Sequence, residues 1–461
     1  MIYLFHSFEF WIFFFLIFLI YWILPQKYRN ATLLLGSYIF YSSWNLKLLS
    51  LILISTLTDY ICGLKIYSEE NNKKRRFYLT ISIITNLSLL GFFKYFNFFI
   101  ENFIFLLNSL GFQANISTLQ IILPVGISFY TFQTLSYTID IYRKKIKPTK
   151  NIIDFALFVT FFPQLIAGPI ERAKRLIPIL KEKKYFKDIN FKSAFYFIIW
   201  GLFQKIIIAD NLARFVNDSF ANPSNTALLA AIAFCFQIYC DFAGYSNIAR
   251  GLGLCFGIKL SKNFDIPYLS QTPSEFWRRW HITLSSWVKD YIYIPLGGNR
   301  GKLLGASTIL ITMGLMGLWH GAAWNFVLWG ISWGLITMVY RLFHKYFSIF
   351  NLRRWMILPR ILIFMPLIII TFTLFRSESI NHFILMVSKF SLNYFISVQN
   401  ISILFLIVII IFYDIIRYIK NDELFITKYN FYILSLFYIF LFVLFVHFYS
   451  AENPAFIYFQ F

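Results

Sequence analysis

The amino-acid sequence predicts an all-α polytopic membrane protein, and three observations predict that class. The chain has 461 residues, of which 59% are hydrophobic and only 14% are charged. An average soluble domain carries about 25% charged residues. Apolar runs such as 8–24 and 429–449 are long enough to cross a hydrocarbon layer of about 30 Å, and basic loops separate such runs. We therefore expect a single membrane-embedded domain over residues 1–461.

The net charge of +21 is explained by the positions of the basic residues. Runs of Lys and Arg at 73–76, 143–147 and 172–184 lie between apolar segments, and cytoplasmic loops of membrane proteins carry such an excess of positive charge. A nucleic-acid-binding protein would instead present its basic patch on a soluble fold, so we expect membrane lipid as the surroundings and no nucleic-acid partner. The four cysteines have no C-x-x-C spacing, and no histidine cluster has zinc spacing, so no metal site is predicted.

Placing the basic loops in the cytoplasm orders the crossings in the first part of the chain. The apolar segment 8–24 ends at basic residues, which places the N-terminus outside. Two crossings fit between residues 31 and 66, with a turn near 42–45, and two more fit between 77 and 141. Segment 152–170 begins and ends beside basic loops and contains two prolines, so we expect it to be re-entrant, with protein covering its backbone.

The second part of the chain continues the same alternation. The longest polar interruption, 259–302, is again basic and is expected to lie in the cytoplasm. The total is about eleven or twelve crossings, with boundaries set to within ~2–4 residues. The crossings expected in this part are 191–214, 226–258, 303–319, 322–343, 355–375, 396–416 and 429–449.

The polar interruption contains a segment with helical periodicity, SEFWRRWHITLSSWVKDYIY at 274–293. Its apolar residues recur at three- and four-residue spacing and predict one face of a helix that opens at Pro273. Glu275 is spaced to pair with Arg279 along this helix. Two interpretations remain open, an interfacial helix with its cations toward lipid headgroups or a polar path that meets an anionic donor. The polar stripe with the same period consists of Arg278, His281, Ser285 and Lys289.

A histidine in the stretch GLWHGAAW, 317–324, has a different setting from the other five histidines of the chain. No charged residue occurs from Leu303 to Met338, so His320 is expected inside the membrane, where burying an imidazole costs energy unless it has a partner. Its ordinary pKa of ~6.5 suits a base at neutral pH. Gly317 and Gly321 also fit the small-xxx-small pattern of helix packing. From the residues alone, both a working histidine and a packed histidine with a satisfied hydrogen bond remain open.

A second group whose burial in the membrane costs free energy is the carboxylate of Asp241, in FQIYCDFAGYSNIARGLG. An acid this deep in an apolar run needs a cation or several hydrogen-bond donors. A structural clamp and a substrate contact are equally open interpretations of this carboxylate. The polar residues that follow it closely, and are its expected partners, are Tyr245, Ser246, Asn247 and Arg250.

Longer stretches of the sequence carry a resemblance to a known family. They resemble the membrane-bound O-acyltransferase family, in particular its bacterial branch that includes alginate O-acetyltransferase. The D-alanine transferase of teichoic acid modification is similar to the same stretches more distantly. The stretches are KYFNFF at 94–99, LPVGISFYTFQTLSYTIDIYR at 123–143, FFPQLIAGPIER at 161–172, CDFAGYSNIARG at 240–251, EFWRRWHITLSSWVKDYIYIPLGGNR at 275–300, GLWHGAAWNFVLWG at 317–330 and FIYFQF at 456–461.

The resemblance implies roles for two histidines and a particular fold. His320 would be the catalytic histidine of the W-H-G motif, and His281 a second functional histidine in the W-R-R-W-H motif. Asn247 stands where the motif has an acidic residue in its GYSD form, so we assign that position no role. The implied fold is a ring of tilted helices around a thinned centre, with a funnel from outside and a donor tunnel from the cytoplasm.

The resemblance also implies the reaction. We expect transfer of an acyl group, expected to be acetyl, from a cytoplasmic thioester such as acetyl-CoA to a hydroxyl of a cell-surface polysaccharide or of a periplasmic hydrolase-like relay protein. His320 is expected to act as the general base, a role worth ~10²–10⁴-fold in rate, and His281 to orient the donor or assist proton movement. No bound cofactor is expected, and the expected location is the bacterial cytoplasmic (inner) membrane.

The remaining candidates concern substrate binding and competing functions. Arg278 and Arg279 are expected to attract the anionic donor, and Asp241 and Trp319 are further candidates for substrate contact. Transfer of D-alanyl or another acyl group to a cell-envelope polymer is an alternative within the same class. A transporter of a lipid-linked glycan would also use buried polar groups and a central cavity, and an assembly scaffold would tolerate substitution of both histidines.

Overall fold

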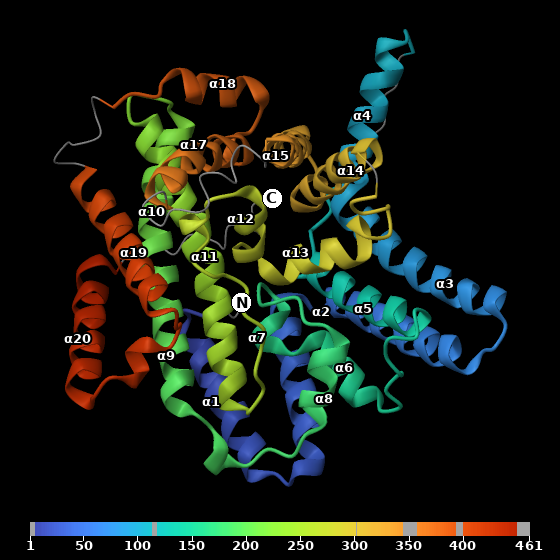
Figure 1. Cartoon of the computed structure of the whole chain (residues 1–461). Helices are drawn as coiled ribbons and strands as arrows, with labels where there is room; N and C mark the ends of the chain where they lie inside the picture. Colours follow the sequence, from blue (N-terminus) through green and yellow to red (C-terminus); the bar gives the residue numbers. More distant parts are fainter. Residues whose placement is uncertain (1–4, 113–117, 301, 344–356, 393–399, 450–461) are drawn as a thin grey trace. The chain divides into compact units, whose positions relative to one another are not determined.

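The computed structural model describes residues 5–112, 118–300, 302–343, 357–392 and 400–449, and within these ranges it contains helices and no β-strand (Figure 1). This confirms the predicted all-α polytopic membrane class. The motif FIYFQF at 456–461 lies outside the described residues. Among the described residues, seven helices are long and apolar enough to cross a membrane: Gln26–Ser68, Asn72–Ser109, Phe191–Ala221, Ala227–Cys255, Ile357–Arg376, Ile401–Lys420 and Phe431–Phe448.

This number is smaller than the eleven or twelve crossings expected, partly because the two segments predicted as crossings between 31 and 66 form one long, bent helix. Helix α2, Gln26–Ser68, has 43 residues and bends where Asn45 leaves helical dihedral angles, at φ −159° and ψ 109°. The Asn45 side chain accepts hydrogen bonds from the backbone N–H groups of Lys47 and Leu48 and so caps the second half of the helix. The two crossings predicted between 31 and 66 thus fall on the two halves of α2, and the turn predicted near 42–45 corresponds to the bend at Asn45. Helix α1, Phe8–Ile23, is apolar but shorter.

The chain divides into two compact units, Met1–Ala194 with Ala249–Ser261 and Phe195–Ile248 with Lys262–Phe461. In the first unit α2 packs against α3, α5 and α6. A buried polar cluster lies among these helices, where Ser82 and Asn86 donate hydrogen bonds of 2.6 and 2.8 Å to the Asp59 carboxylate. Such bonds hold membrane helices together. The other helices of this unit are α3 (Asn72–Leu90), α4 (Phe96–Ser109), α5 (Ile127–Tyr142), α6 (Ile152–Thr160), α7 (Phe162–Leu165) and α8 (Ala173–Lys181).

The segment predicted to be re-entrant, 152–170, is broken into the short helices α6 and α7. Every residue from 154 to 170 is buried. The break falls at Phe161, two residues before Pro163, which cannot continue a hydrogen-bonded helix from the preceding turn. The protein therefore covers this non-continuous backbone, as a re-entrant segment requires.

The second unit contains all of the candidate site residues. The predicted crossing 226–258 is present here as α11 (Ala227–Cys255). The segment predicted as a crossing at 322–343 forms the helix α15 (Trp324–Leu342), which is not among the seven helices named above. Residues 355–356 and 396–399 of two other predicted crossings lie outside the described residues. The remaining elements are α9 (Phe191–Leu202), which starts in the first unit, the π-helical turn η3 (Phe203–Ala209), α10 (Asp210–Ala221), α12 (Pro273–Arg279), α13 (Ile282–Val288), α14 (Lys302–His320), α17 (Ile357–Arg376), α18 (Ile380–Ser388), α19 (Ile401–Lys420) and α20 (Phe431–Phe448).

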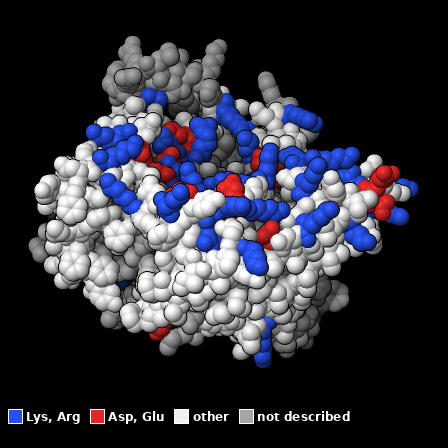
Figure 2. Space-filling view, turned by 90° about the horizontal axis from the view of Figure 1, so that it is seen from below, with Lys and Arg blue, Asp and Glu red and all other residues white. Residues whose placement is uncertain are grey.

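Charged and apolar side chains are segregated on the surface. Lys and Arg gather in a band on the face shown in Figure 2, with Asp and Glu among them, and the neighbouring surface carries few charges. Large apolar side chains are exposed on several helices, including Phe105 at 75%, Leu342 at 74% and Phe431 at 77%. Exposed apolar surface of this kind is what helices present to lipid.

Candidate active site

The segment that carries His281 is two helices with a corner between them. Helix α12 ends at Arg279 and α13 begins at Ile282. Trp280 has an extended backbone, and His281 adopts the left-handed conformation at φ 40° and ψ 55°. L-residues other than glycine rarely adopt this conformation because their Cβ crowds the following carbonyl. The prediction of one continuous helix opening at Pro273 is therefore wrong beyond Arg279.

The corner separates the residues that the sequence placed on one polar stripe. His281 is only 1% exposed and lines an internal cavity. Arg278, Ser285 and Lys289 line a different, larger pocket. A helical period holds only along an unbroken helix, and the left-handed residue rotates α13 relative to α12.

His320 is the last residue of α14 and is 5% exposed. Its imidazole contacts three aromatic rings, with centroid distances of 5.0 Å to Trp319, 5.0 Å to Trp329 and 5.4 Å to Phe375. Gly321 follows it, and a Cβ at that position would lie 2.1 Å from the ring of Phe326. The histidine is therefore held in an aromatic setting at a helix end.

The glycines around His320 serve close packing between α14 and α15, which lie side by side (Figure 1). A Cβ on Gly317 would lie 2.1 Å from the carbonyl oxygen of Phe326. A Cβ on Gly330 would lie 2.1 Å from the carbonyl oxygen of Met313. The small-xxx-small interpretation of Gly317 is thus confirmed, and it does not compete with a chemical role for His320.

The structure brings His281 and His320 to one small cavity of about 10 Å³. This is about the space that a single water molecule needs. The ring of Trp319 contacts both imidazoles, at 6.5 Å from His281 and 5.0 Å from His320 by ring centroid, but Trp319 is not among the described residues that line the cavity. The other described residues that line the cavity are Ile238, Phe242, Trp280, Trp329, Phe372 and Phe375.

The apolar surroundings determine the charge of His281. Burial lowers its pKa to about 3, because the desolvated imidazole disfavours the protonated form. At neutral pH the ring is therefore uncharged and has one nitrogen that donates and one that accepts. It can exchange a proton or hydrogen-bond with a reacting group without carrying a permanent positive charge.

A second pocket, of about 520 Å³, lies beside α12 and α13. This volume is in the range of small-molecule sites. Its described lining includes the cations Arg278, Lys289 and Arg341 and no acidic residue. Trp277 also lines it, and the Trp277 ring meets the ring of Trp329, a wall of the histidine cavity, at 6.1 Å. The remaining lining residues are Ser274, Ile282, Ser285, Ser286, Val288, Tyr293, Ile309, Thr312, Met313, Met316 and Thr337.

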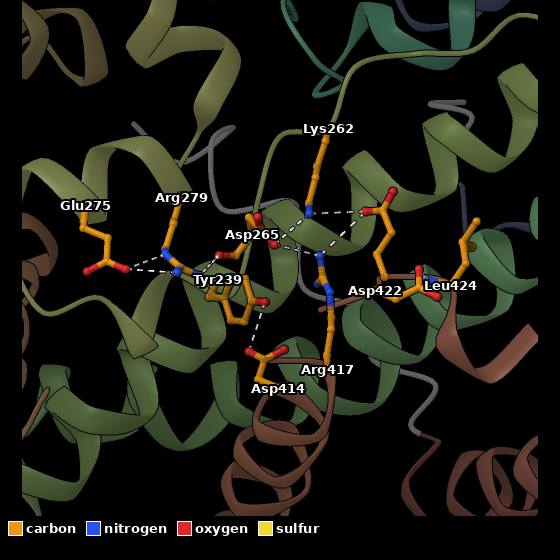
Figure 3. Close-up of polar contacts among 10 residues, drawn as sticks. Tyr239, Lys262, Asp265, Glu275, Arg279, Asp414, Arg417, Asp422 and Leu424 are labelled. Atoms are coloured by element: carbon orange, nitrogen blue, oxygen red, sulfur yellow. Dashed lines mark hydrogen bonds and ion pairs between the residues drawn. The ribbon is translucent and has the colours of Figure 1, made fainter. Parts of the chain in front are cut away.

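Arg279 is not among the described residues that line this pocket. It forms the predicted pair with Glu275, at 2.9 Å, and also donates a hydrogen bond of 3.2 Å to the carbonyl oxygen of Asp265 (Figure 3). The two neighbouring arginines thus face different surroundings, and only Arg278 lines the pocket.

Asp241 is paired with a cation that sequence reasoning missed. The Lys205 Nζ lies 2.8 Å from the Asp241 carboxylate and 2.7 Å from that of Asp210, and all three side chains are buried. Asn247 instead donates to Gln204, at 2.7 Å. A lysine inside the apolar run 191–214 was the available signal, since such a charge requires a partner. Asp241 is not among the described lining residues of either cavity.

The family model described as membrane-bound O-acyltransferase matches residues 145–381, about half of the chain. The matched region contains both histidines and the lining of both cavities.

Individual relatives are similar over most of the chain. A probable alginate O-acetylase of Azotobacter vinelandii is 42% identical over 316 residues, which are 68% of this chain and 63% of that protein. A peptidoglycan O-acetyltransferase of Helicobacter pylori is 40% identical over 360 residues, 70% of this chain and 67% of that protein. A teichoic acid D-alanyltransferase of Bacillus subtilis is 25% identical over 277 residues, 56% of this chain and 70% of that protein.

Proposed function

Because the chain belongs to the membrane-bound O-acyltransferase family, and is thereby an acyltransferase, we propose that it transfers an acetyl group from a thioester donor to a hydroxyl of a cell-envelope polymer or of a relay protein. The observation that carries this proposal is the pair of histidines on one small aromatic cavity. Of the relatives described above, the one from Azotobacter vinelandii is named for O-acetylation of alginate and the one from Helicobacter pylori for O-acetylation of peptidoglycan.

His320 is the proposed general base. An alcohol is a poor nucleophile at neutral pH, so a base must take its proton as the oxygen attacks the thioester carbonyl. The new ester C–O bond forms, the C–S bond breaks, and the proton passes through the imidazole to the departing thiolate. A positioned base contributes ~10²–10⁴-fold to the rate of such a step.

His281 is proposed to assist from the other position on the cavity. Because its imidazole is neutral at pH 7, one ring nitrogen carries a hydrogen that can be donated. Donation to the carbonyl oxygen stabilises the negative charge that develops there in the transition state. This role orients the donor and requires no change in the charge of His281.

The larger pocket is the proposed donor site. The described lining of this pocket has three cations and no acidic residue, so it favours binding of an anionic molecule. Its volume of about 520 Å³ accommodates part of an elongated molecule. Acetyl-CoA has phosphates for these cations and a thin pantetheine arm that ends in the thioester. The contact between Trp277 and Trp329 joins the walls of the two cavities, so the arm would enter the histidine cavity there.

The size and lining of the histidine cavity favour acetyl over D-alanyl as the group transferred. The space of about 10 Å³ suits a methyl group. A D-alanyl ester carries an ammonium group, and none of the described lining residues is acidic. We also propose that the protein lies in the bacterial cytoplasmic membrane, with the donor on the side of its basic loops and the acceptor outside.

The acceptor is proposed to be the hydroxyl of a surface polysaccharide, reached directly or through a periplasmic hydrolase-like relay protein. Mass analysis of surface glycans from cells that carry each variant tests this. We expect O-acetyl groups with the wild type and with the control variant His382→Ala. The His382 ring forms a hydrogen bond with the carbonyl oxygen of Phe220 and is not among the described residues that line the cavity. His320→Ala should reach the same membrane level yet lower acetylation at least 100-fold.

The same experiment separates the competing function classes. Normal acetylation with His320→Ala would overturn the proposal. If the protein were a transporter, cells with His320→Ala would lack the glycan at their surface. If it is an acyltransferase, the glycan would be present but without acetyl groups. Labelled acetyl-CoA supplied to purified protein then tests the donor, because only an acyltransferase consumes it.

A further inference from the structure

The corner at His281 needs support from outside its own helices. His281 has a positive φ without being glycine, and it precedes α13 without capping that helix by its side chain. Non-glycine residues keep such a backbone only where the surrounding structure holds them in it. The first N–H groups of α13 also need acceptors, because no earlier turn supplies them.

Two backbone hydrogen bonds hold the corner on either side. The N–H of Asp265 donates to the carbonyl of Arg279 at 2.8 Å, and the N–H of Ile282 donates to the carbonyl of Asn263 at 2.8 Å. Segment 263–265 therefore runs alongside 279–282, and its bonds bracket Trp280 and His281. We call segment 263–265 the strap.

The side chain of Asn263 completes the support. Its Oδ1 accepts from the hydroxyl of Thr283 at 2.9 Å and from the Thr283 N–H at 3.3 Å. Its Nδ2 donates to Ser246 Oγ on α11 at 3.1 Å. Asn263 thus provides, from outside, the cap that His281 does not provide for α13, and it fixes that cap to a long buried helix.

The outer end of the strap is held by charges. The Asp265 carboxylate pairs with Lys262 at 2.7 Å and with Arg417 of α19 at 3.1 Å, and Asp414 one turn earlier on α19 accepts from Tyr239 (Figure 3). The Asp265 side chain is 40% exposed, so solvent weakens these pairs. Asn263 is 1% exposed, and its hydrogen bonds are shielded from water.

We propose that Asn263 is a positioning residue that holds the His281 ring toward the cavity it shares with His320. It does so through the strap and the cap on α13, and it touches no reacting atom. This inference rests on the proposed function only for the consequence in catalysis. The structural part, that Asn263 fixes the place of the His281 ring, stands apart from it.

Chemical labelling tests the structural part without any acyl transfer. Diethyl pyrocarbonate modifies neutral, accessible imidazoles, and mass spectrometry of the full-length protein in detergent gives the rate at each histidine. We expect His281 to react at least ten times faster in Asn263→Ala than in the wild type. Asn86→Ala, which removes an equally buried asparagine of the first unit, should leave the His281 rate unchanged. An unchanged rate in Asn263→Ala would overturn the proposal.

Kinetics test the catalytic consequence. We expect Asn263→Ala to lower kcat about 10–100-fold while the donor KM stays within about two-fold, since a displaced group acts on the transition state rather than on binding. In a His281→Ala background the same change should have little further effect. A full additional loss there would show that Asn263 acts by another route and would overturn the inference.

A milder variant keeps the test decisive if Asn263→Ala does not fold. Thr283→Val keeps the shape of the side chain but removes the hydroxyl that donates to Asn263. Compared with Asn263→Ala, we expect a smaller rise in the labelling rate of His281 and a smaller fall in kcat. No change in either quantity would contradict the inference. If wild-type protein transfers no acyl group, the proposed function fails, while the labelling result still decides the role of Asn263.

Discussion

The imidazole rings of His281 and His320 line the same small cavity but are held there by different means. His320 stands at the end of α14 and packs against the rings of Trp329 and Phe375. His281 stands on a corner with a left-handed backbone that the strap supports. Changes that loosen the strap should therefore affect His281 and spare His320.

Acidification is expected to destabilise the protein through His281. Its pKa is about 3 in the folded protein and near 6.5 in the unfolded chain. Below pH 6.5 the unfolded chain binds a proton that the folded protein does not, so stability is complete above that pH and falls toward pH 3. At pH 5 the loss is about 2 kcal/mol. The unfolding temperature in detergent should drop more between pH 7.5 and 5.0 for the wild type than for His281→Gln, and equal drops would refute this.

The buried cluster of Lys205, Asp210 and Asp241 is expected to be a structural clamp. Lys205→Met leaves two buried carboxylates without their cation, which costs about 3–5 kcal/mol. Replacing both carboxylates as well, with Asp210→Asn and Asp241→Asn, removes the uncompensated charge and should restore much of the membrane level and unfolding temperature. We expect this triple variant to retain acyl transfer. A folded but inactive triple variant would instead indicate that Asp241 contacts substrate.

The cations of the larger pocket are expected to act on donor affinity. Lys289→Gln should raise the KM for acetyl-CoA by about 5–10-fold with little change in kcat, because the charge acts equally on bound donor and transition state. The matched control is Lys428→Gln, an exposed lysine paired with Asp422 at 2.8 Å. Initial rates at several donor concentrations give both constants. If KM for acetyl-CoA is unchanged in all three variants Arg278→Gln, Lys289→Gln and Arg341→Gln, the donor does not bind in this pocket.

Much of the fold could be predicted because the length of an apolar segment and the basic loops at its ends indicate a membrane helix. The turn expected near 42–45 corresponds to the bend of α2 at Asn45, and α11 lies within three residues of its predicted ends. The break at His281 could not be predicted this way. Hydrophobic periodicity runs through 276–291 without interruption, while the left-handed corner depends on hydrogen bonds from the strap.

A candidate site residue can be selected from the sequence where it is unusual in its own segment, whereas a partner that is distant in sequence cannot be predicted in this way. His320 was conspicuous because no charged residue surrounds it. The sequence predicts four nearby residues as partners of Asp241, yet the cation that pairs with its carboxylate is Lys205 on another helix. Asn263 lies in a polar segment where an asparagine is ordinary, and only the contacts with Thr283 and Ser246 distinguish it.

The width of the histidine cavity is expected to select the acyl group. Ile238 of α11 is 3% exposed and forms part of the wall. Ile238→Ala removes three carbon atoms there and makes room for a longer chain. Because one methylene in an apolar pocket is worth ~10–200-fold in discrimination, the ratio of propionyl to acetyl transfer should rise at least about ten-fold.

The comparison needs a control because any large-to-small change in a core costs stability, about 2–5 kcal/mol for Ile→Ala. Ile410→Ala provides it, since Ile410 is 1% exposed on α19 and is not among the described lining of either cavity. The two variants should lose similar unfolding temperature, yet only Ile238→Ala should change the ratio of propionyl to acetyl transfer, measured with paired labelled donors. A ratio that stays at the wild-type value in Ile238→Ala would mean that the acyl chain does not enter this cavity.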